Sequence, residues 1–185
     1  MVNERLRSPS NAGAIQDAVA RGTSASFVCG SFVELSLEID DSTLIGDVKF
    51  RTNGCGYMIA AADVLSEWLR EKTLADLHGL AEAELMHIVV EKLCAFPADR
   101  VQCAEIAFQA LRKAMAAYRE RRVEEFQGEK ALICTCFGVS EETIVTAISE
   151  NSLSDVDQVV ELCRAGSGCG SCRMLIQELV DMRLG

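Results

Sequence analysis

The feature that most limits how this chain can fold is a set of four cysteines near its end. They form two close pairs in the pattern C-x-C-x(32)-C-x-x-C: Cys134, Cys136, Cys169 and Cys172. The stretch between the pairs is long enough for a helical hairpin, so the second pair can fold back onto the first. Four sulfurs around one centre are the ligand set of an iron-sulfur cluster. Structural zinc is the alternative, but zinc sites favour pairs separated by about two to four residues.

Composition and charge limit the class of protein. The 185 residues are 49% hydrophobic and carry a net charge of -10. This apolar content suffices for the cores of one or two small domains. The acidic balance disfavours nucleic acid and anionic membranes as partners, because both bind basic surfaces. We therefore expect protein partners.

Cysteine usage indicates the redox compartment. The chain has nine cysteines, an odd number, and it shows no charged start followed by an apolar run. No apolar stretch approaches the roughly eighteen residues of a membrane span. We expect a cytoplasmic protein whose reduced thiolates hold metal, in place of a disulfide framework.

Alternating hydrophobicity in the first part of the chain predicts a small antiparallel sheet. Apolar and polar residues alternate over 33–39 and again over 47–51, with a turn beginning at Asp40 between them. Residues 24–28 are expected to add a third strand. From Tyr57 onwards the apolar period becomes helical, which predicts helices that cover the sheet and an α+β domain over residues 1–122.

Three helices are expected in that domain, over 58–69, 85–93 and 104–118, with Asp99 as the N-cap of the last one. The charged residues 123–131 contain Gly128 and lack apolar periodicity, so they are interpreted as a linker. Residues 132–185 form a second, all-helical domain in this interpretation. Ser140 and Ser154 are its predicted helix caps, and a last helix is expected over 171–182.

Three further cysteines lie at the ends of predicted elements: Cys29 in a Cys-Gly loop, Cys55 between two glycines, and Cys103 near the start of the long helix. Helix N-termini lower the pKa of a thiol and favour the thiolate that binds metal. Glycines allow backbone amides to approach the sulfur. Buried, inert thiols are the alternative, and they remain the expectation for Cys94 and Cys163.

The segments around these cysteines resemble known families. Residues 50–60, FRTNGCGYMIA, resemble the signature around the second cysteine of IscU-type iron-sulfur scaffolds. Residues 8–13, SPSNAG, are similar to the N-terminal Pro-x-Asn-x-Gly stretch of those scaffolds. Residues 133–137, ICTCF, and 165–172, AGSGCGSC, resemble the BFD-like 2Fe-2S domain in the middle of NifU. The regions follow the order found in NifU and cover nearly the whole chain.

The resemblance implies a scaffold on which iron-sulfur clusters are assembled. Cys29, Cys55 and Cys103 would hold a transient cluster or zinc, and the four later cysteines a permanent, redox-active 2Fe-2S cluster. The implied partners are a cysteine desulfurase as sulfur donor, apo iron-sulfur acceptor proteins and a second copy of the chain in a homodimer. The chain itself is not expected to be an enzyme. The Nfu-type third domain of NifU does not follow before Gly185.

Two positions depart from the pattern of the family. Its Cys-Gly-Asp loop reads CGS at 29–31, and its His-Cys pair reads QC at 102–103. Ser31 and Gln102 therefore occupy family ligand positions, but a hydroxyl and an amide are poorer ligands for iron or zinc than carboxylate and imidazole. The fourth ligand is then expected from a second subunit, a partner protein or Cys94.

A function of another class remains open. The same residues fit a 2Fe-2S electron-transfer or redox-sensing protein whose first domain is a docking module or holds a stable cluster. The neutral side chains of Ser31 and Gln102 favour this alternative. The chaperone-recognition segment of IscU, Leu-Pro-Pro-Val-Lys, reads FPADR at 96–100, which argues against cluster transfer by the usual Hsp70 route.

Overall fold

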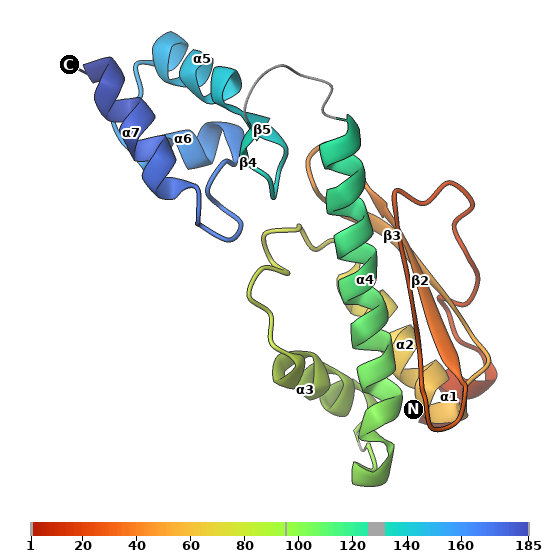
Figure 1. Ribbon diagram of the computed structural model, residues 1–185. Helices are drawn as coiled ribbons and strands as arrows, with labels where there is room; N and C mark the ends of the chain where they lie inside the picture. Colours follow the sequence, from red (N-terminus) through yellow and green to blue (C-terminus); the bar gives the residue numbers. More distant parts are fainter. Residues whose placement is uncertain (1, 95, 126–131, 185) are drawn as a thin grey trace. The chain divides into compact units, whose positions relative to one another are not determined.

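The chain folds into two compact units, residues 1–118 and residues 119–185 (Figure 1). The computed structural model describes residues 2–94, 96–125 and 132–184. Each unit has its own apolar core. The predicted linker begins at residue 123, which is still helical in α4 (Val101–Glu125), and its residues 126–131 lie outside the described part of the chain.

The first unit contains a three-stranded antiparallel sheet in the order β1-β2-β3. Its strands are β1 (Ala20–Ala25), β2 (Phe32–Ile39) and β3 (Ile45–Thr52). The predicted hairpin of β2 and β3 is confirmed. The third strand was predicted too late in the chain, since β1 ends at Ala25 and the segment 26–28 belongs to the loop before β2. The loop contains the exposed apolar residues Phe27 and Val28, and their hydrophobicity led to the prediction of a strand there.

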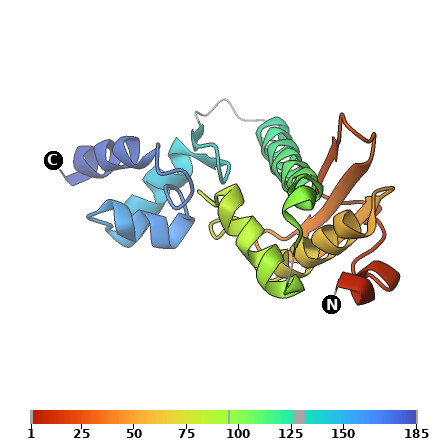
Figure 2. The ribbon, with the colours of Figure 1, turned by 90° about the horizontal axis from the view of Figure 1, so that it is seen from below.

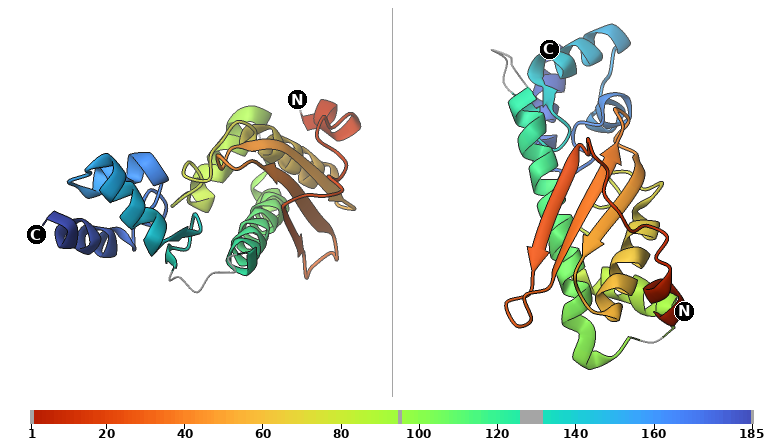
Figure 3. Two further views of the ribbon diagram at one scale, coloured as in Figure 1. Left: turned by 90° about the horizontal axis from the view of Figure 1, so that it is seen from above. Right: turned by 90° about the vertical axis from the view of Figure 1, so that its right-hand side faces the viewer.

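Helices cover one face of this sheet, and the strands lie in front of them in the right-hand view of Figure 3. They are α2 (Gly56–Leu69) and α4, and α3 (Glu82–Leu93) packs against α2. Val33, Leu35 and Leu37 of β2 are fully buried in the shared core. Asp99 does not cap α4 as predicted, because a short 3-10 helix, η1 (Ala98–Arg100), precedes that helix and contains the residue.

A glycine lets α4 approach the sheet closely. Gly22 in β1 is buried, and a Cβ atom at this position would collide with the backbone of Ala110 and Ala114 in α4. Next to it along the strand, the Ser24 hydroxyl donates a hydrogen bond to Gln109 Oε1 at 2.9 Å. The helix that carries Cys103 and the strand that leads to Cys29 are therefore in direct contact.

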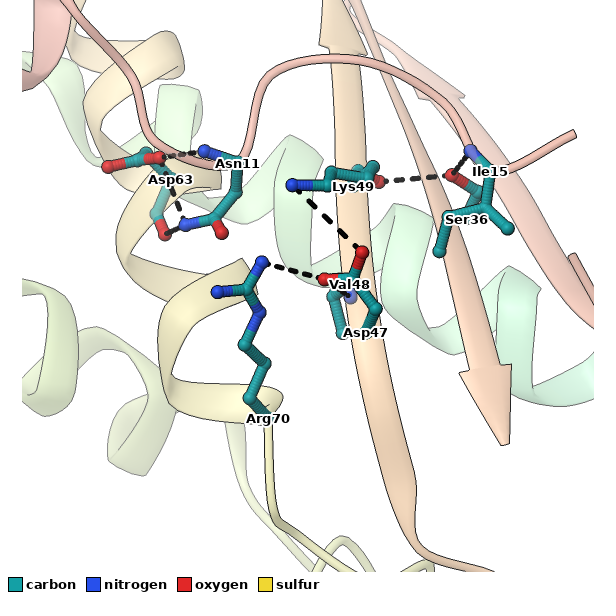
Figure 4. Close-up of polar contacts among 8 residues, drawn as sticks. All are labelled: Asn11, Ile15, Ser36, Asp47, Val48, Lys49, Asp63 and Arg70. Carbon is teal, nitrogen blue, oxygen red and sulfur yellow. Dashed lines mark hydrogen bonds and ion pairs between the residues drawn. The ribbon is translucent and has the colours of Figure 1, made fainter. Parts of the chain in front are cut away.

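The N-terminal segment is attached to α2 by a buried polar cluster (Figure 4). Asp63 is fully buried and accepts hydrogen bonds at its Oδ1 from the backbone N–H of Asn11 at 2.9 Å and from the Asn11 side-chain amide at 3.1 Å. Its Oδ2 forms an ion pair of 2.6 Å with Arg5 in α1 (Val2–Arg7), which lies beside α2 (Figure 2). Further along, the Ile15 N–H donates to Ser36 Oγ at 3.0 Å.

The second unit packs three helices against a small hairpin. The hairpin consists of β4 (Leu132–Cys134) and β5 (Val139–Ser140), and the helices are α5 (Glu141–Asn151), α6 (Val156–Cys163) and α7 (Arg173–Leu184). Ser140 caps α5 as predicted, since its hydroxyl accepts from the Thr143 N–H at 3.2 Å. The cap of α6 is Asp155 and not Ser154. The hairpin was missed because its strands are too short to show a period of two.

None of the helices in the described ranges is both long and apolar enough to cross a membrane.

Candidate metal centres

Three cysteines from three different elements meet at one cavity in the first unit. Cys29 lies in the loop after β1, Cys55 is the N-cap of α2, and Cys103 lies in the first turn of α4. The cavity has a volume of about 280 Å³. Its other lining residues are Ser26, Val28, Ser31, Met58, Arg100 and Gln102. The fold thus brings the predicted cysteine triad and both departing positions to one place.

Cys55 and Cys103 form a close thiol pair, with their sulfurs 3.6 Å apart. Burial raises the pKa of Cys103 to about 11, and the hydrogen bond with Cys55 adds to this effect. Burial also opposes ionisation of Cys55, but its pKa is lowered overall because the N–H groups of Met58 and Tyr57 and the Cys103 thiol donate to its sulfur. Cys55 is therefore the member of the pair that loses its proton first.

Cys29 is the most accessible thiol of the triad. The hydroxyls of Ser26 and Ser31 donate to its sulfur and lower its pKa to about 7. Two apolar neighbours, Phe27 and Val28, are also exposed on this loop. At neutral pH a substantial fraction of Cys29 is thiolate, the form that binds metal and attacks sulfur.

The positions that could have supplied other ligands are neutral or distant. Ser31 and Gln102 line the cavity, but they bring neither carboxylate nor imidazole to it. Cys94, expected in the core or as a substitute ligand, is exposed at the C-cap of α3 with φ 62° and is absent from the described cavity lining. Its interpretation as a core thiol is wrong, because the helix ends there and its side chain is left outside the apolar stripe.

The four cysteines of the second unit approach one another in two pairs. Each pair joins one cysteine of the C-x-C motif to one cysteine of the C-x-x-C motif. The Cys136 and Cys169 sulfurs are 3.4 Å apart, and the Cys172 thiol interacts with that of Cys134. Burial raises the pKa of Cys172 to about 11, and the neighbouring Cys134 contributes in the same direction. The Ser171 hydroxyl, 2.6 Å from the sulfur, lowers the pKa of Cys169.

A glycine allows the two cysteine segments to meet. A Cβ atom at Gly168 would lie 3.0 Å from the side chain of Cys136 and 3.0 Å from the ring of Phe137, which is tighter than an ordinary van der Waals contact. Cys134 and Cys172 are buried in the core of the unit. The fifth cysteine, Cys163, is half-buried at the end of α6 and donates to the Val159 carbonyl at 3.1 Å, in agreement with a packing role.

The donor chemistry of both places fits iron and sulfide better than a single hard ion. Within the described ranges, no three His, Cys, Asp or Glu side chains converge closely enough to hold one metal ion. The sulfurs instead come in pairs, as in Cys55 with Cys103 and Cys136 with Cys169. In a 2Fe-2S cluster each iron takes a pair of protein ligands, and thiolates are the ligands that such clusters use.

Each of the two units matches a known protein family. Residues 1–125 match the NifU-like N terminal domain family, and residues 132–182 match the BFD-like 2Fe-2S binding domain family. The chain belongs to the NifU-like family. The predicted resemblance and the α+β fold with a helical second domain are thereby confirmed. The cofactor prediction also agrees with these matches, since the second family is described as 2Fe-2S binding.

Among curated relatives, the nitrogen fixation protein NifU of Nostoc sp. is 31% identical over 97% of this NifU-like chain and 61% of its own length. NifU of Azotobacter chroococcum is 30% identical over 99% of this chain and 58% of that protein. The chain thus spans about three-fifths of these relatives. The iron-sulfur cluster assembly scaffold protein IscU of Rickettsia prowazekii is 28% identical over 65% of this chain and 91% of its own.

A solved structure of the N-terminal part of a NifU-like protein from Brucella abortus is also similar to this chain. The identity is 17% over 65% of this chain and 92% of that one, with a TM-score of 0.49.

Two features of the first unit were missed in the sequence. Arg100 was noted only as part of a departing segment, although it lines the cysteine cavity. Asp63 was not noted at all, although an acidic residue between Ala62 and Val64 in an apolar stretch is a signal of a buried ion pair.

Proposed function

We propose that this NifU-like chain is an iron-sulfur cluster scaffold. A transient cluster forms on Cys29, Cys55 and Cys103 and passes to apo acceptor proteins. The observation that carries this proposal is the meeting of three thiols from three different elements at an open cavity. Such a site can hold a cluster and still release it, since one of its walls is the exposed Cys29 loop.

The second unit carries a permanent 2Fe-2S cluster in this proposal, with Cys134, Cys136, Cys169 and Cys172 as ligands. Its family is described as 2Fe-2S binding, and its sulfurs are partly enclosed by the core of the unit. This cluster supplies or relays electrons for assembly or release. The chain does not turn over a small-molecule substrate, and it is active as a homodimer.

A cysteine desulfurase is the proposed sulfur donor. The thiolate character of Cys29 supports this role, because a thiolate attacks the outer sulfur of a persulfide and the loop presents it to a partner. The similarity to NifU and IscU proteins supports the same partner and the apo acceptors by analogy of fold and sequence.

Cluster transfer tests the scaffold function. The full chain is reconstituted with iron and sulfide without oxygen, and apo-ferredoxin is then added. We expect the acceptor to gain a 2Fe-2S spectrum while the chain keeps its four-cysteine cluster. The chain with Cys29, Cys55 and Cys103 replaced by serine is the control, and it should transfer nothing. Equal transfer by this control would contradict the proposal.

The second candidate is a 2Fe-2S electron-transfer or redox-sensing protein whose first unit holds a stable cluster or serves in docking. The neutral Ser31 and Gln102 in the cavity lining favour it. In that case the reconstituted chain reduces an electron acceptor through the second unit, but it gives no cluster to apo-ferredoxin.

A further inference from the structure

The cavity of the cysteine triad has an unusual balance of charge. Arg100 is its sole basic residue, and no carboxylate or imidazole belongs to the lining that the structure describes. Asp99 pairs with the Arg100 Nε at 3.4 Å, but its side chain is 75% exposed and lies outside that lining. A bare iron(II) ion entering here meets a positive charge and, besides the thiols, only the neutral hydroxyl and amide side chains of Ser26, Ser31 and Gln102.

Arg100 is held where its charge reaches the sulfurs. Its guanidinium lies over the Tyr57 ring, 5.9 Å from the centroid, and Tyr57 in turn packs edge-on against Phe96 at 5.7 Å. Arg100 lines the same cavity as Cys55 and Cys103. The start of α2 adds to the positive side, because backbone N–H groups there donate to the Cys55 sulfur.

We propose that this site selects its cargo by charge. It holds an anionic, thiolate-ligated 2Fe-2S cluster that keeps one small exogenous thiolate as its fourth ligand, and Arg100 is the specificity-determining residue that stabilises the negative charge. An oxidised 2Fe-2S core with four thiolates is a dianion, and three protein sulfurs leave one ligand position for a thiolate from outside. The inference rests on the proposed scaffold function and names the form in which the cluster enters and stays.

The chemistry is ligand exchange and needs no oxidant or reductant. Each protein thiol forms a sulfur-iron bond while the bond between that iron and one small thiolate breaks. The thiol proton leaves with the displaced thiolate as a free thiol. After three such exchanges both irons keep their oxidation state, the complex keeps its charge, and one exogenous thiolate remains bound.

Two loading reactions of the full chain separate the cases. One supplies a preformed 2Fe-2S complex with 2-mercaptoethanol thiolate ligands, and the other supplies iron(II) and sulfide at the same iron concentration. Iron bound by the chain with Cys29, Cys55 and Cys103 replaced by serine is subtracted in both reactions, so that the second unit does not contribute. The remaining uptake belongs to the cavity.

We expect the preformed complex to load the cavity faster than iron(II) and sulfide. Arg100→Gln should slow loading of the complex by about tenfold at low salt, since one favourable charge is lost, and the difference should shrink as salt is added. Arg100→Lys should restore most of the rate because it keeps the charge. Ser31→Asp should act oppositely, with faster iron(II) loading and slower loading of the complex.

Arg112→Gln is the matched control, since this arginine lies on α4, the helix that follows the η1 turn of Arg100, pairs with Glu82 at the surface and is absent from the described cavity lining. It should load like the parent.

Native mass spectrometry of the loaded chain should find one bound mercaptoethanol for each cavity cluster. A cluster bridged between two chains without added thiol, or equal loading by Arg100→Gln and the parent, would overturn the charge selection. If the parent and the triple-serine chain bind equal iron in both reactions, the scaffold function itself fails.

Discussion

The two cysteine sites of this protein use the same ligand chemistry in opposite surroundings. In the first unit, Cys29 and Cys55 are exposed and only Cys103 is buried. In the second unit, Cys134 and Cys172 are part of the core, Cys136 is half-buried, and Cys169 is the exposed member of the four. The shell of side chains around a metal site controls how far solvent reaches it. Under the proposed function, burial of the sulfurs, and not their identity, would separate a cluster that is passed on from one that stays.

The largest expected effect is the loss of the enclosed cluster. Cys172→Ser removes a buried cysteine that is proposed as a ligand of the second unit, and we expect the iron bound by that unit to fall by about a hundredfold, because removal of a ligand costs more than removal of a supporting hydrogen bond. Iron content and the visible spectrum measure it in the triple-serine chain. Cys163→Ser in the same unit is the control, and it should keep its colour. If Cys163→Ser also lost its colour, the loss in Cys172→Ser would reflect misfolding of the unit and not the removal of a ligand.

The next prediction tests whether the two units unfold independently of each other. Gly22→Ala places a methyl group against the backbone of α4. We expect a loss of about 2 kcal/mol in the free energy of unfolding of the first unit, from overpacking. Chemical denaturation followed by circular dichroism measures it, and the absorbance of the second-unit cluster should persist through this transition. Gly46→Ala in β3 is the control, since a Cβ atom there meets nothing within 4 Å.

A chelator should distinguish the sites directly. When the loaded chain is mixed with an iron chelator, we expect iron on the open cysteines to leave about tenfold faster than iron on the enclosed ones, because the chelator reaches the exposed sulfurs first. Stopped-flow absorbance resolves the two phases, and the triple-serine chain identifies the slow one. A single phase for both sites would remove the basis of the comparison.

The smallest expected effect concerns Cys29 in the metal-free protein. Its pKa of about 7 means that the thiolate is lost as the pH falls through 7. Alkylation at Cys29 should therefore slow by about fivefold between pH 7 and pH 6, as the thiolate fraction falls. Peptide mass spectrometry after timed exposure to iodoacetamide measures the rate. Ser26→Ala removes a hydroxyl donor and should move the midpoint to higher pH, and an unchanged midpoint would show that the hydroxyl has no effect.

Much of the fold followed from periodicity in the sequence. The β2–β3 hairpin and the helices α2 and α3 have long, regular apolar patterns, so their prediction was confirmed. The start of β1 was missed because its inward residues are small: Ala20, Gly22 and Ser24 carry little hydrophobic signal and are buried only because α4 lies so close. Tertiary packing, and not strand propensity, determines that strand.

The cysteines could be selected from the sequence, but their partners could not. Spacing indicated which thiols act together, whereas the pairing of Cys136 with Cys169 across the motifs depends on how the loop before α7 returns to the hairpin. Arg100 was overlooked for a similar reason. A single arginine in a polar segment has no pattern, and its importance arises from the turn of η1 that brings it to the cavity.

The contact of β1 with α4 has a consequence for genetics. Gly22 has no side chain that could bind metal, and it lies in the middle of a strand. It nevertheless determines how closely the helix bearing Cys103 approaches the strand that leads to Cys29. In a selection for cells that depend on this protein for the proposed cluster supply, substitutions of Gly22 by side chains larger than alanine should therefore be recovered among the loss-of-function alleles. A map of such alleles would mark this strand as strongly as the cysteines themselves.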